Sequence, residues 1–363
     1  MITEITIKNF KSLKNIKSKL NSLNILTGLN GVGKSSFLQS FLLIMQSTKL
    51  EKGIIELRGS LTDVGVGRDA LYQFAQDEKI VFEIKMNSEQ YLWECNYQKD
   101  ADFLEANNKY LGTQITMLQK AAEQFHYINN IRYWPSEIYP ISSDVSEKKQ
   151  IGTKGEYAPY YIYLFGNDYV VPEALRHEKA TSKTLLSQIN AWMKEISPGV
   201  SLQTQSVPYI NLITLYYQFD YGNNKTNTFL PKNVGSGISY VIPVILILLT
   251  ATEGKTIIIE NPESHIHPRG QVEIGKLIAL AAQNGAQVFV ETHSDHILNG
   301  IRVAVKESKV DKDKVNILFF DKETTEIEQY TKITSIKIDK NGSLSDYPDN
   351  FMDEWSNQLS KLI

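Results

Sequence analysis

A glycine-rich stretch from Gly28 to Ser35, GLNGVGKS, constrains this chain more than any other feature. It fits the pattern G-x-x-x-x-G-K-[ST], in which glycines allow a tight turn and main-chain N–H groups surround a phosphate chain. Lys34 would reach the β- and γ-phosphates, and the Ser35 hydroxyl would bind Mg²⁺. Residues 22–27 predict a buried strand before the loop, and residues 35–45 predict a helix after it. This order indicates a phosphate-binding loop at a positive helix N-terminus.

Composition narrows the class of protein. The 363 residues suffice for one large α/β domain or two smaller ones. A net charge of −3 gives no overall electrostatic reason to bind nucleic acid, which leaves only a local basic patch. The single cysteine, Cys95, excludes an intrachain disulfide framework and agrees with a reducing cytoplasm. The N-terminus lacks a signal-peptide layout. The longest apolar run, residues 240–251, is shorter than the roughly 20 residues of a membrane span, so no membrane segment is expected.

The first hundred residues are rich in predicted strands. Apolar residues alternate in 2–10, and residues 54–57 and 79–86 also have strand character. A series of lysines accompanies the first strand: Lys8, Lys11, Lys14, Lys17 and Lys19. They are interpreted either as a solvated face and turn or as a basic edge that contacts DNA or RNA phosphates.

The middle of the chain, residues 101–225, differs in character. Residues 101–126 have a helical composition, and residues 181–196 form a clear amphipathic pattern that ends before Pro198. Residues 151–171 are rich in tyrosine. Aromatic side chains can stack on bases, but without adjacent lysines packing in a core is the favoured interpretation.

The last third returns to nucleotide-binding signals. Residues 235–239, GSGIS, open an apolar helix through residue 249, and small residues at a helix N-terminus can bind anions. Residues 256–260, TIIIE, predict a strand that ends in a carboxylate, a position that can hold Mg²⁺ beside a phosphate-binding loop. A further strand, residues 287–290, leads into His293, and residues 316–320 are expected to be the last strand of the sheet. Asn341-Gly342 predicts a hairpin turn in the small appendage that follows.

These motifs, taken in order, resemble the ABC-type ATPase heads of the SMC, RecF and OLD-like group. The resemblance covers residues 1–100 and 225–335, and residues 151–156, IGTKGE, look like a connecting motif of its shorter members. Residues 347–353, YPDNFMD, look like the C-terminal extension of a bacterial subfamily of defence-associated ATPases.

The implied fold class is α/β: a P-loop NTPase of the ABC-type head. The implied domains are an N-lobe with Walker A (1–100), an inserted lateral region (101–225), a C-lobe with signature, Walker B and switch histidine (226–333) and a C-terminal extension (334–363).

The resemblance also assigns roles to individual residues. The Walker A residues that would bind ATP are Asn30, Gly31, Gly33, Lys34, Ser35 and Ser36. Ser236 and Gly237 of the signature motif would contact the γ-phosphate of ATP held by the other subunit. Glu260 would be the Walker B acid acting on Mg²⁺ together with Ser35, and His293 would hydrogen-bond the γ-phosphate. Two ATP molecules would thus be enclosed in a head-to-tail homodimer that forms with ATP and separates after hydrolysis.

One position departs from the family pattern. The residue after the Walker B acid usually carries a carboxylate that polarises the attacking water, and here it is Asn261. An amide can orient water but cannot accept its proton. Glu263 is the nearest substitute, so hydrolysis is expected to be slow or to use Glu263. Gln73 is a candidate for the glutamine of the Q-loop.

The histidines allow a second interpretation. Four of them, His265, His267, His293 and His296, fall within 32 residues and could form a metal site with Glu263, Glu291 or Asp295. The nucleotide interpretation already explains His293, so we favour packing or dimer contacts for His265 and His267. Glu291 and Asp295 would then orient His293.

The sequence therefore predicts an ATPase, with three hypotheses for its role. The first is a regulator of bacterial anti-phage defence that controls a separate effector protein, a nuclease or toxin, because the 30-residue appendage is too small for a nuclease domain. The second is a DNA maintenance ATPase of RecF or SMC type. The third, motivated by Asn261, is a nucleotide-gated scaffold with negligible turnover.

Overall fold

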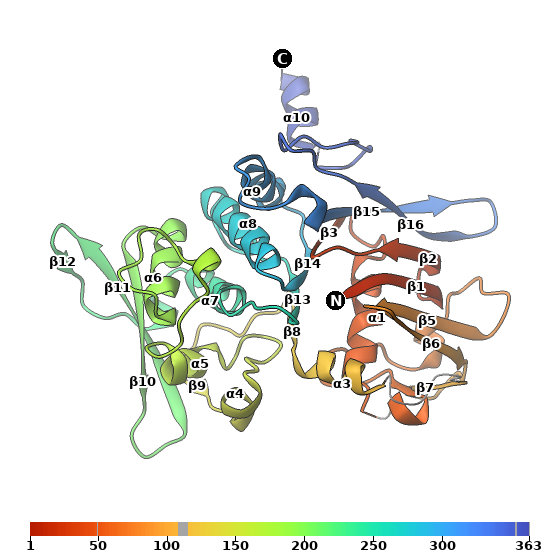
Figure 1. Ribbon diagram of the computed structural model, residues 1–363, viewed down its shortest axis with the longest axis horizontal. Coiled ribbons are helices and arrows are strands. Elements are labelled where there is room, and N and C mark those ends of the chain that lie inside the picture. The colour runs from red at the N-terminus through yellow and green to blue at the C-terminus, as the bar shows by residue number, and fades with distance from the viewer. Residues whose placement is uncertain (49, 108–114, 353, 363) are drawn as a thin grey trace. The chain divides into compact units, whose positions relative to one another are not determined.

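The structure, a computed structural model, describes residues 1–48, 50–107, 115–352 and 354–362. The chain forms two compact units. Unit 1 comprises residues 1–125, 312–339 and 343–363, and unit 2 comprises residues 126–311 and 340–342. Figure 1 labels the helices and strands of both units.

Unit 1 contains an antiparallel sheet built mainly from the start of the chain. Its strands follow the order β2 (Leu13–Lys19), β1 (Ile2–Phe10), β5 (Lys79–Met86), β6 (Glu89–Asn96), β7 (Phe103–Ala106) and β4 (Ile54–Glu56). Buried residues alternate with more exposed ones along β5, as expected for a sheet with one buried face. The predicted strands at 2–10, 54–57 and 79–86 are confirmed.

The second strand group of unit 1 carries the glycine-rich loop. β3 (Leu23–Gly28) is buried along its whole length and pairs in parallel with β15 (Val315–Thr324). The predicted strand at residues 316–320 is confirmed as part of β15. It is not the last strand, as predicted, because β16 (Gln329–Ile336) follows and pairs antiparallel with β15. The sequence analysis missed β16 because residues 329–336 have neither a long apolar run nor a regular alternation, and their burial in the structure is irregular as well. Helix α1 (Lys34–Gln46) follows the loop as predicted, and its Phe37 ring packs edge-on to Phe320 at 5.5 Å.

The remaining elements of unit 1 are short. They are α2 (Gly67–Ala70), α3 (Ile115–Glu123), α10 (Glu354–Leu362) and the 3₁₀ turns Leu50–Lys52 and Lys312–Lys314. The helical prediction for residues 101–126 is therefore wrong for β7, while residues 108–114 lie outside the described residues. β7 forms a strand because its main chain completes the sheet beside β4 and β6, a tertiary effect that local composition does not report.

Unit 2 has a parallel strand pair covered by helices. β13 (Thr256–Glu260) pairs in parallel with β14 (Gln287–Glu291), and β8 (Phe125–Ile128) lies next to β13. Both predicted strands here are confirmed, and so is the helix that opens near Gly235. The helices are α6 (Leu185–Ile196), α7 (Ser236–Leu249), α8 (Pro268–Gln283) and α9 (Asp295–Lys306).

A second, antiparallel sheet of unit 2 packs beside α6, where the Leu202 N–H of the sheet donates to Asn190 Oδ1 of the helix. Its strands are β9 (Tyr139–Pro140), β10 (Val200–Ser206), β11 (Leu212–Tyr221) and β12 (Asn224–Lys225). The unit is completed by α4 (Ser143–Lys148), α5 (Ala158–Phe165) and the 3₁₀ turns Glu173–Leu175 and Pro231–Asn233. Four tyrosines of the 151–171 stretch fall on α5 or its N-cap, and of these only Tyr161 is buried, whereas Tyr163 is exposed. The core interpretation is therefore confirmed for Tyr161 and wrong for Tyr163.

The C-terminal appendage contains the predicted turn. Ile338 bridges to Leu344 in antiparallel fashion, and Gly342 has a φ of 79°. In the YPDNFMD motif, residues 347–353, the Phe351 ring packs edge-on to Phe319 with 5.6 Å between the ring centroids. Asp353 of this motif lies outside the described residues. Among the described residues, no helix is long and apolar enough to cross a membrane.

Candidate nucleotide-binding site

The glycine-rich loop of unit 1 has a backbone that only glycine favours at three positions. Gly28, Gly31 and Gly33 have φ values of 137°, 78° and 103°. A Cβ on Gly28 would lie 2.1 Å from the carbonyl oxygen of Phe320, and one on Gly33 would lie 2.3 Å from Thr331 Oγ1. The first and last glycines of the motif are therefore required both by backbone conformation and by close packing.

Two segments far apart in the sequence hold this loop. The Thr331 hydroxyl on β16 donates to the Val32 carbonyl oxygen at 2.8 Å and lies 2.9 Å from the Ser12 hydroxyl oxygen. The Thr331 N–H donates to the Ser12 carbonyl oxygen, also at 2.9 Å. β16 and the turn between β1 and β2 thus fix the loop in place before any ligand arrives.

The charged residue of the motif is folded over the loop. Lys34 is 4% exposed, and its ammonium donates to the carbonyl oxygens of Gly28 at 3.0 Å and Leu29 at 2.7 Å. Asn30, Gly31 and Ser35 are exposed, and Ser36 is half-buried. The first turn of α1 contains no acidic residue, so the positive end of the helix and the ammonium together favour an anion at this loop.

An open cavity of about 330 Å³ adjoins the loop within unit 1, at the lower end of the size range of small-molecule sites. Gln73 lines it, together with Gly31, Val32 and the aromatic residues Tyr72 and Phe74. The structure thereby places the proposed Q-loop glutamine next to the glycine-rich loop, although its role remains a prediction. Further lining residues include Lys11, Ser12, Lys322, Gln329, Tyr330 and Thr331.

In unit 2, Glu260 lies at the end of β13 and is held by three donors. The Tyr127 hydroxyl donates to Oε1 at 2.8 Å, the Asn130 N–H donates to Oε2 at 3.3 Å, and Arg132 Nη2 donates to the Glu260 carbonyl oxygen at 2.6 Å. Burial raises the pKa of the Glu260 carboxyl group, while the two hydrogen bonds and the Arg132 charge oppose that rise. The result is a buried carboxylate fixed in one orientation.

Glu263 joins the segments that follow β13 and β14. Its Oε1 accepts from the His293 N–H at 2.9 Å, and its Oε2 is buried with no hydrogen-bond partner among the described residues. Asn261 has a φ of 45°, and its N–H donates to the Glu291 carbonyl oxygen at 2.8 Å. The structure thus brings Glu263 to the main chain of His293, two residues that the sequence predicted for catalysis independently.

The signature residues begin α7 as expected. Gly235 is the N-cap, and Ser236 and Gly237 form the first turn. A Cβ on Gly237 would lie 2.1 Å from the carbonyl oxygen of His265, and the His265 ring lies 5.1 Å from that of Tyr240. The helix start is therefore packed against the loop after β13, and the glycine permits the close approach.

The metal interpretation of the histidines finds no support. Among the described residues, no three His, Cys, Asp or Glu side chains are grouped as a metal site requires. His267 Nδ1 accepts from the Arg269 N–H at 3.3 Å and caps α8, which gives this residue a structural role. The Asp295 carboxylate lies 3.6 Å from His296 Nε2, and any role in orienting His293 remains a prediction.

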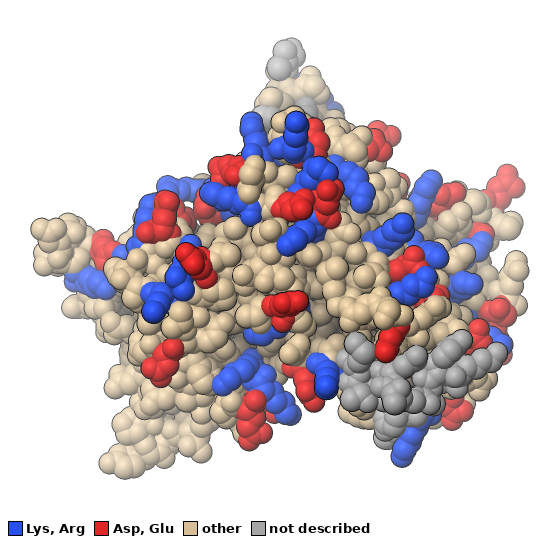
Figure 2. All heavy atoms as spheres, viewed as in Figure 1, with Lys and Arg blue, Asp and Glu red and all other residues tan. Residues whose placement is uncertain are grey.

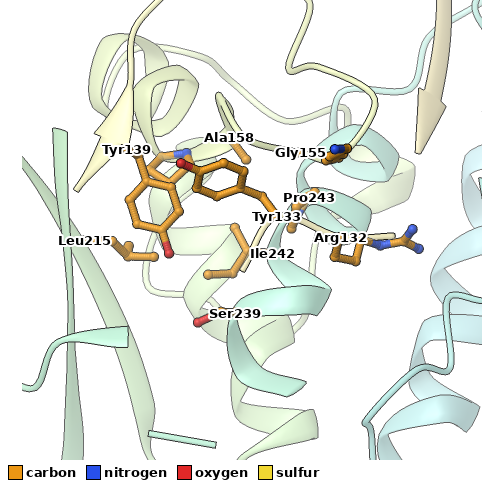
Figure 3. A pocket seen from close by; sticks show the side chains of 11 residues that line it. Arg132, Tyr133, Tyr139, Gly155, Ala158, Leu215, Ser239, Ile242 and Pro243 are labelled. Atoms are coloured by element: carbon orange, nitrogen blue, oxygen red, sulfur yellow. The ribbon is translucent and has the colours of Figure 1, made fainter. Parts of the chain in front are cut away.

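The sequence analysis did not predict Tyr127, Asn130 and Arg132 as site residues, because no local pattern marks them as partners of a residue about 130 positions away. In Figure 3 the guanidinium of Arg132 points away from the rings of Tyr133 and Tyr139, which line a small pocket.

The IGTKGE motif, residues 151–156, forms main-chain hydrogen bonds with the segment 127–133 that carries Tyr127, Asn130 and Arg132. Its Thr153 carbonyl oxygen accepts from the Asn129 N–H, and its Lys154 carbonyl oxygen accepts from the Tyr133 N–H, both at 2.9 Å.

Comparisons with known proteins place the chain in a family. Residues 23–299 match the family described as "AAA domain, putative AbiEii toxin, Type IV TA system", and residues 310–362 match a protein family of unknown function, DUF3696. No curated protein matches the sequence.

Solved structures of Smc heads share the fold. The head bound to the C-terminal winged-helix domain of ScpA superposes with a TM-score of 0.57 at 14% identity, covering 93% of this chain and 98% of that one. A Smc head with an extended coiled coil, bound to the C-terminal domain of ScpA from Pyrococcus furiosus, gives 0.52 at 12% identity and covers 99% of both chains. The expected α/β P-loop fold of the SMC head type is thus confirmed, and the chain belongs to the AAA-domain family defined by the match over residues 23–299.

Proposed function

We propose that this protein binds ATP with Mg²⁺ and hydrolyses it to ADP and phosphate. The observation that carries the proposal is the glycine-rich loop, whose three positive φ values and buried, inward-folded Lys34 prepare a phosphate site at a helix N-terminus. The AAA-domain family and the Smc-head fold support the same conclusion.

The residues present fit the nucleotide and its metal. Main-chain N–H groups of the loop and the Lys34 ammonium are donors for phosphate oxygens. Ser35 and Glu260 offer the oxygen ligands that Mg²⁺ prefers, and bound Mg²⁺ would neutralise charge on the phosphates. The loop, helix and metal would thus lower the barrier by positioning and electrostatics.

Glu263 is our candidate for the general base. Its buried Oε2 has no hydrogen-bond partner among the described residues, so it is available to accept a proton. In the proposed step the oxygen of water attacks the γ-phosphorus, its proton passes to Glu263, and the bond to the bridging oxygen of ADP breaks. His293 would donate to a γ-phosphoryl oxygen.

We further propose that ATP drives assembly of a homodimer or higher homo-oligomer in the cytoplasm. Ser236 and Gly237 would contact the γ-phosphate of the nucleotide on the neighbouring subunit, since they form the first turn of α7. The printed family description names a toxin system, and the Smc heads were solved with a bound partner domain. A regulator of anti-phage defence with a separate nuclease or toxin is therefore the cellular role we favour.

The DNA maintenance alternative rested on a basic edge, and the structure gives it no specific support. Lys14 forms an ion pair with Glu328, Lys17 lies 3.4 Å from Glu4, and Lys11 donates to Gln39. Figure 2 shows Lys and Arg interspersed with Asp and Glu over the visible face. Charge reversal at Lys11 and Lys14 should therefore leave binding to duplex DNA unchanged. Weaker binding with a reduced salt dependence would favour this alternative instead.

Phosphate release with Mg-ATP tests the enzymatic proposal. Lys34→Ala should abolish both nucleotide binding and turnover, whereas Glu263→Gln should keep binding and lose turnover. Lys79→Ala, at an exposed position of β5, is the matched control and should behave as the wild type. Nucleotide binding without turnover in the wild type would contradict the proposal and favour the scaffold hypothesis.

Light scattering tests the assembly proposal separately. The Glu263→Gln protein should dimerise with ATP but not with ADP, and Ser236→Arg in that background should remain monomeric. A mass that does not depend on the nucleotide would contradict the switch.

A further inference from the structure

Arg132 in unit 2 is a buried cation that has no assigned role in the proposed ATP hydrolysis. Its side chain is nearly inaccessible, with the residue 8% exposed, and Nη2 donates to the Glu260 carbonyl oxygen. Burial lowers the pKa of the Arg132 guanidinium to about 10, and the charges of Glu260 and Glu263 oppose that fall. Nη1 is buried and has no acceptor among the described residues.

A buried guanidinium nitrogen without an acceptor is costly, and so is a buried carboxylate oxygen without a donor. Both occur in this cluster, at Arg132 Nη1 and Glu263 Oε2. One is a donor with a positive charge and the other an acceptor with a negative charge. The two groups are complementary, and the Glu263 charge already acts on the Arg132 guanidinium.

The main chain around Arg132 is well fixed. The residues Asn129 and Tyr133 on either side of it donate to the carbonyl oxygens of Thr153 and Lys154. A Cβ on Gly155, next in that motif, would lie 2.2 Å from Pro243 of α7, the helix that begins with the signature residues. The segment therefore connects the Glu260 end of β13 to α7 through the 151–156 motif.

We propose that Arg132 is a positioning residue that holds the two carboxylates of the catalytic centre. Through Nη2 it fixes the main chain of Glu260, and through Nη1 it holds Glu263 once nucleotide and Mg²⁺ are bound. This inference rests on the proposed ATPase function, because it assigns Glu260 to the metal and Glu263 to the water. In this proposal Arg132 itself contacts neither the metal ion nor the attacking water.

The test compares Arg132→Ala and Arg132→Lys with Arg302→Lys in the full-length protein. Arg302 is a matched control, since its Nε also donates to a main-chain carbonyl oxygen, that of Gly342, at 2.6 Å. Three quantities are measured: the affinity for a fluorescent ATP analogue in EDTA, the Mg²⁺ concentration that gives half of the metal-dependent signal, and kcat with KM. Cooperative thermal melting confirms that each variant is folded.

We expect Arg132→Ala to raise the half-effective Mg²⁺ concentration about tenfold and to lower kcat about 10- to 100-fold, as for groups that orient metal ligands. Affinity in EDTA should stay unchanged. Arg132→Lys should recover part of the loss, because one ammonium can replace Nη2 but not both nitrogens. If Arg132→Ala does not fold, Arg132→Lys carries the test. The Arg302→Lys control should match the wild type.

A double-mutant cycle tests the link to Glu263. Because Glu263→Gln is expected to keep nucleotide binding but lose turnover, the cycle is measured on the half-effective Mg²⁺ concentration. Adding Arg132→Ala to Glu263→Gln should raise this concentration much less than Arg132→Ala does in the wild type, because the two groups act together. Normal Mg²⁺ dependence and kcat in the folded Arg132 variants, or additive effects in the cycle, would overturn the inference. If the wild type shows no turnover, the ATPase proposal fails, whereas the Mg²⁺ titration still tests Arg132.

Discussion

Gly33→Ala and Gly31→Ala separate two reasons for glycine in the phosphate-binding loop. Both residues have positive φ, 103° and 78°, so both substitutions strain the backbone. A Cβ on Gly31 would meet no atom within 4 Å, whereas one on Gly33 would lie 2.3 Å from Thr331 Oγ1 and 2.8 Å from Ser12 Oγ. Only Gly33→Ala therefore also disrupts the contacts that hold the loop.

The sizes of the two effects follow from these contacts. Gly31→Ala should cost about 1 kcal/mol, the usual strain of a non-glycine residue in the left-handed region. Gly33→Ala adds displacement of the Thr331 hydroxyl and loss of its bond to the Val32 carbonyl oxygen, for a total of about 4 kcal/mol. For a unit of this size, we expect Tm to fall by about 3 °C and about 10 °C respectively.

Calorimetry and binding of a fluorescent ATP analogue measure these changes. We expect Gly33→Ala to weaken nucleotide binding more than tenfold, because its N–H belongs to the phosphate site, and Gly31→Ala to weaken it less. Equal melting and equal binding of the two variants would refute the reasoning, since the close contact at Gly33 would then have no consequence.

Three other substitutions test further parts of the two units. Thr331→Val should weaken ATP binding about tenfold and cost about 1–2 kcal/mol of stability, because the Val32 carbonyl oxygen loses its donor; calorimetry and nucleotide titration measure this. Tyr127→Phe removes a hydrogen bond that lowers the pKa of Glu260, so the acid limb of the kcat–pH profile should move to higher pH; an unchanged limb would contradict this role. Burial lowers the pKa of His126 to about 3, so the unfolded state binds the proton more strongly and stability falls as pH drops from about 6.5 toward 3. His126→Phe should lose less Tm than the wild type between pH 7 and pH 4.5.

The elements around the glycine-rich loop were predictable because their signals are local. A buried strand, a glycine pattern and an apolar helix follow one another within residues 22–46, and the strands 256–260 and 287–291 are short apolar runs of the same kind. Each pattern reports directly on burial, so it needs no knowledge of the rest of the chain.

The supports of the site were not predictable in this way. Thr331 lies about 300 positions from the loop that it holds, and β16 has an irregular pattern of burial. Tyr127 and Arg132 reach Glu260 across 133 and 128 positions. Nothing in their neighbourhood marks them as partners of a carboxylate, because pairing at such separation is decided by the fold.

The structure suggests a conformational reason for Asn261, which stands where the family pattern has a carboxylate. The sequence presents it as the loss of a general base, yet the structure places it at φ 45°, a region that asparagine enters more readily than glutamate. The turn at Asn261 is followed by Glu263, whose Oε1 meets the His293 N–H while Oε2 stays buried. The chain thus carries a carboxylate two residues after the position where the family pattern has one. Because the location of Glu263 depends on this turn, we interpret the Asn261 amide as a conformational element of the proposed site rather than as an inactive base, and the catalytic role of Glu263 stays a prediction.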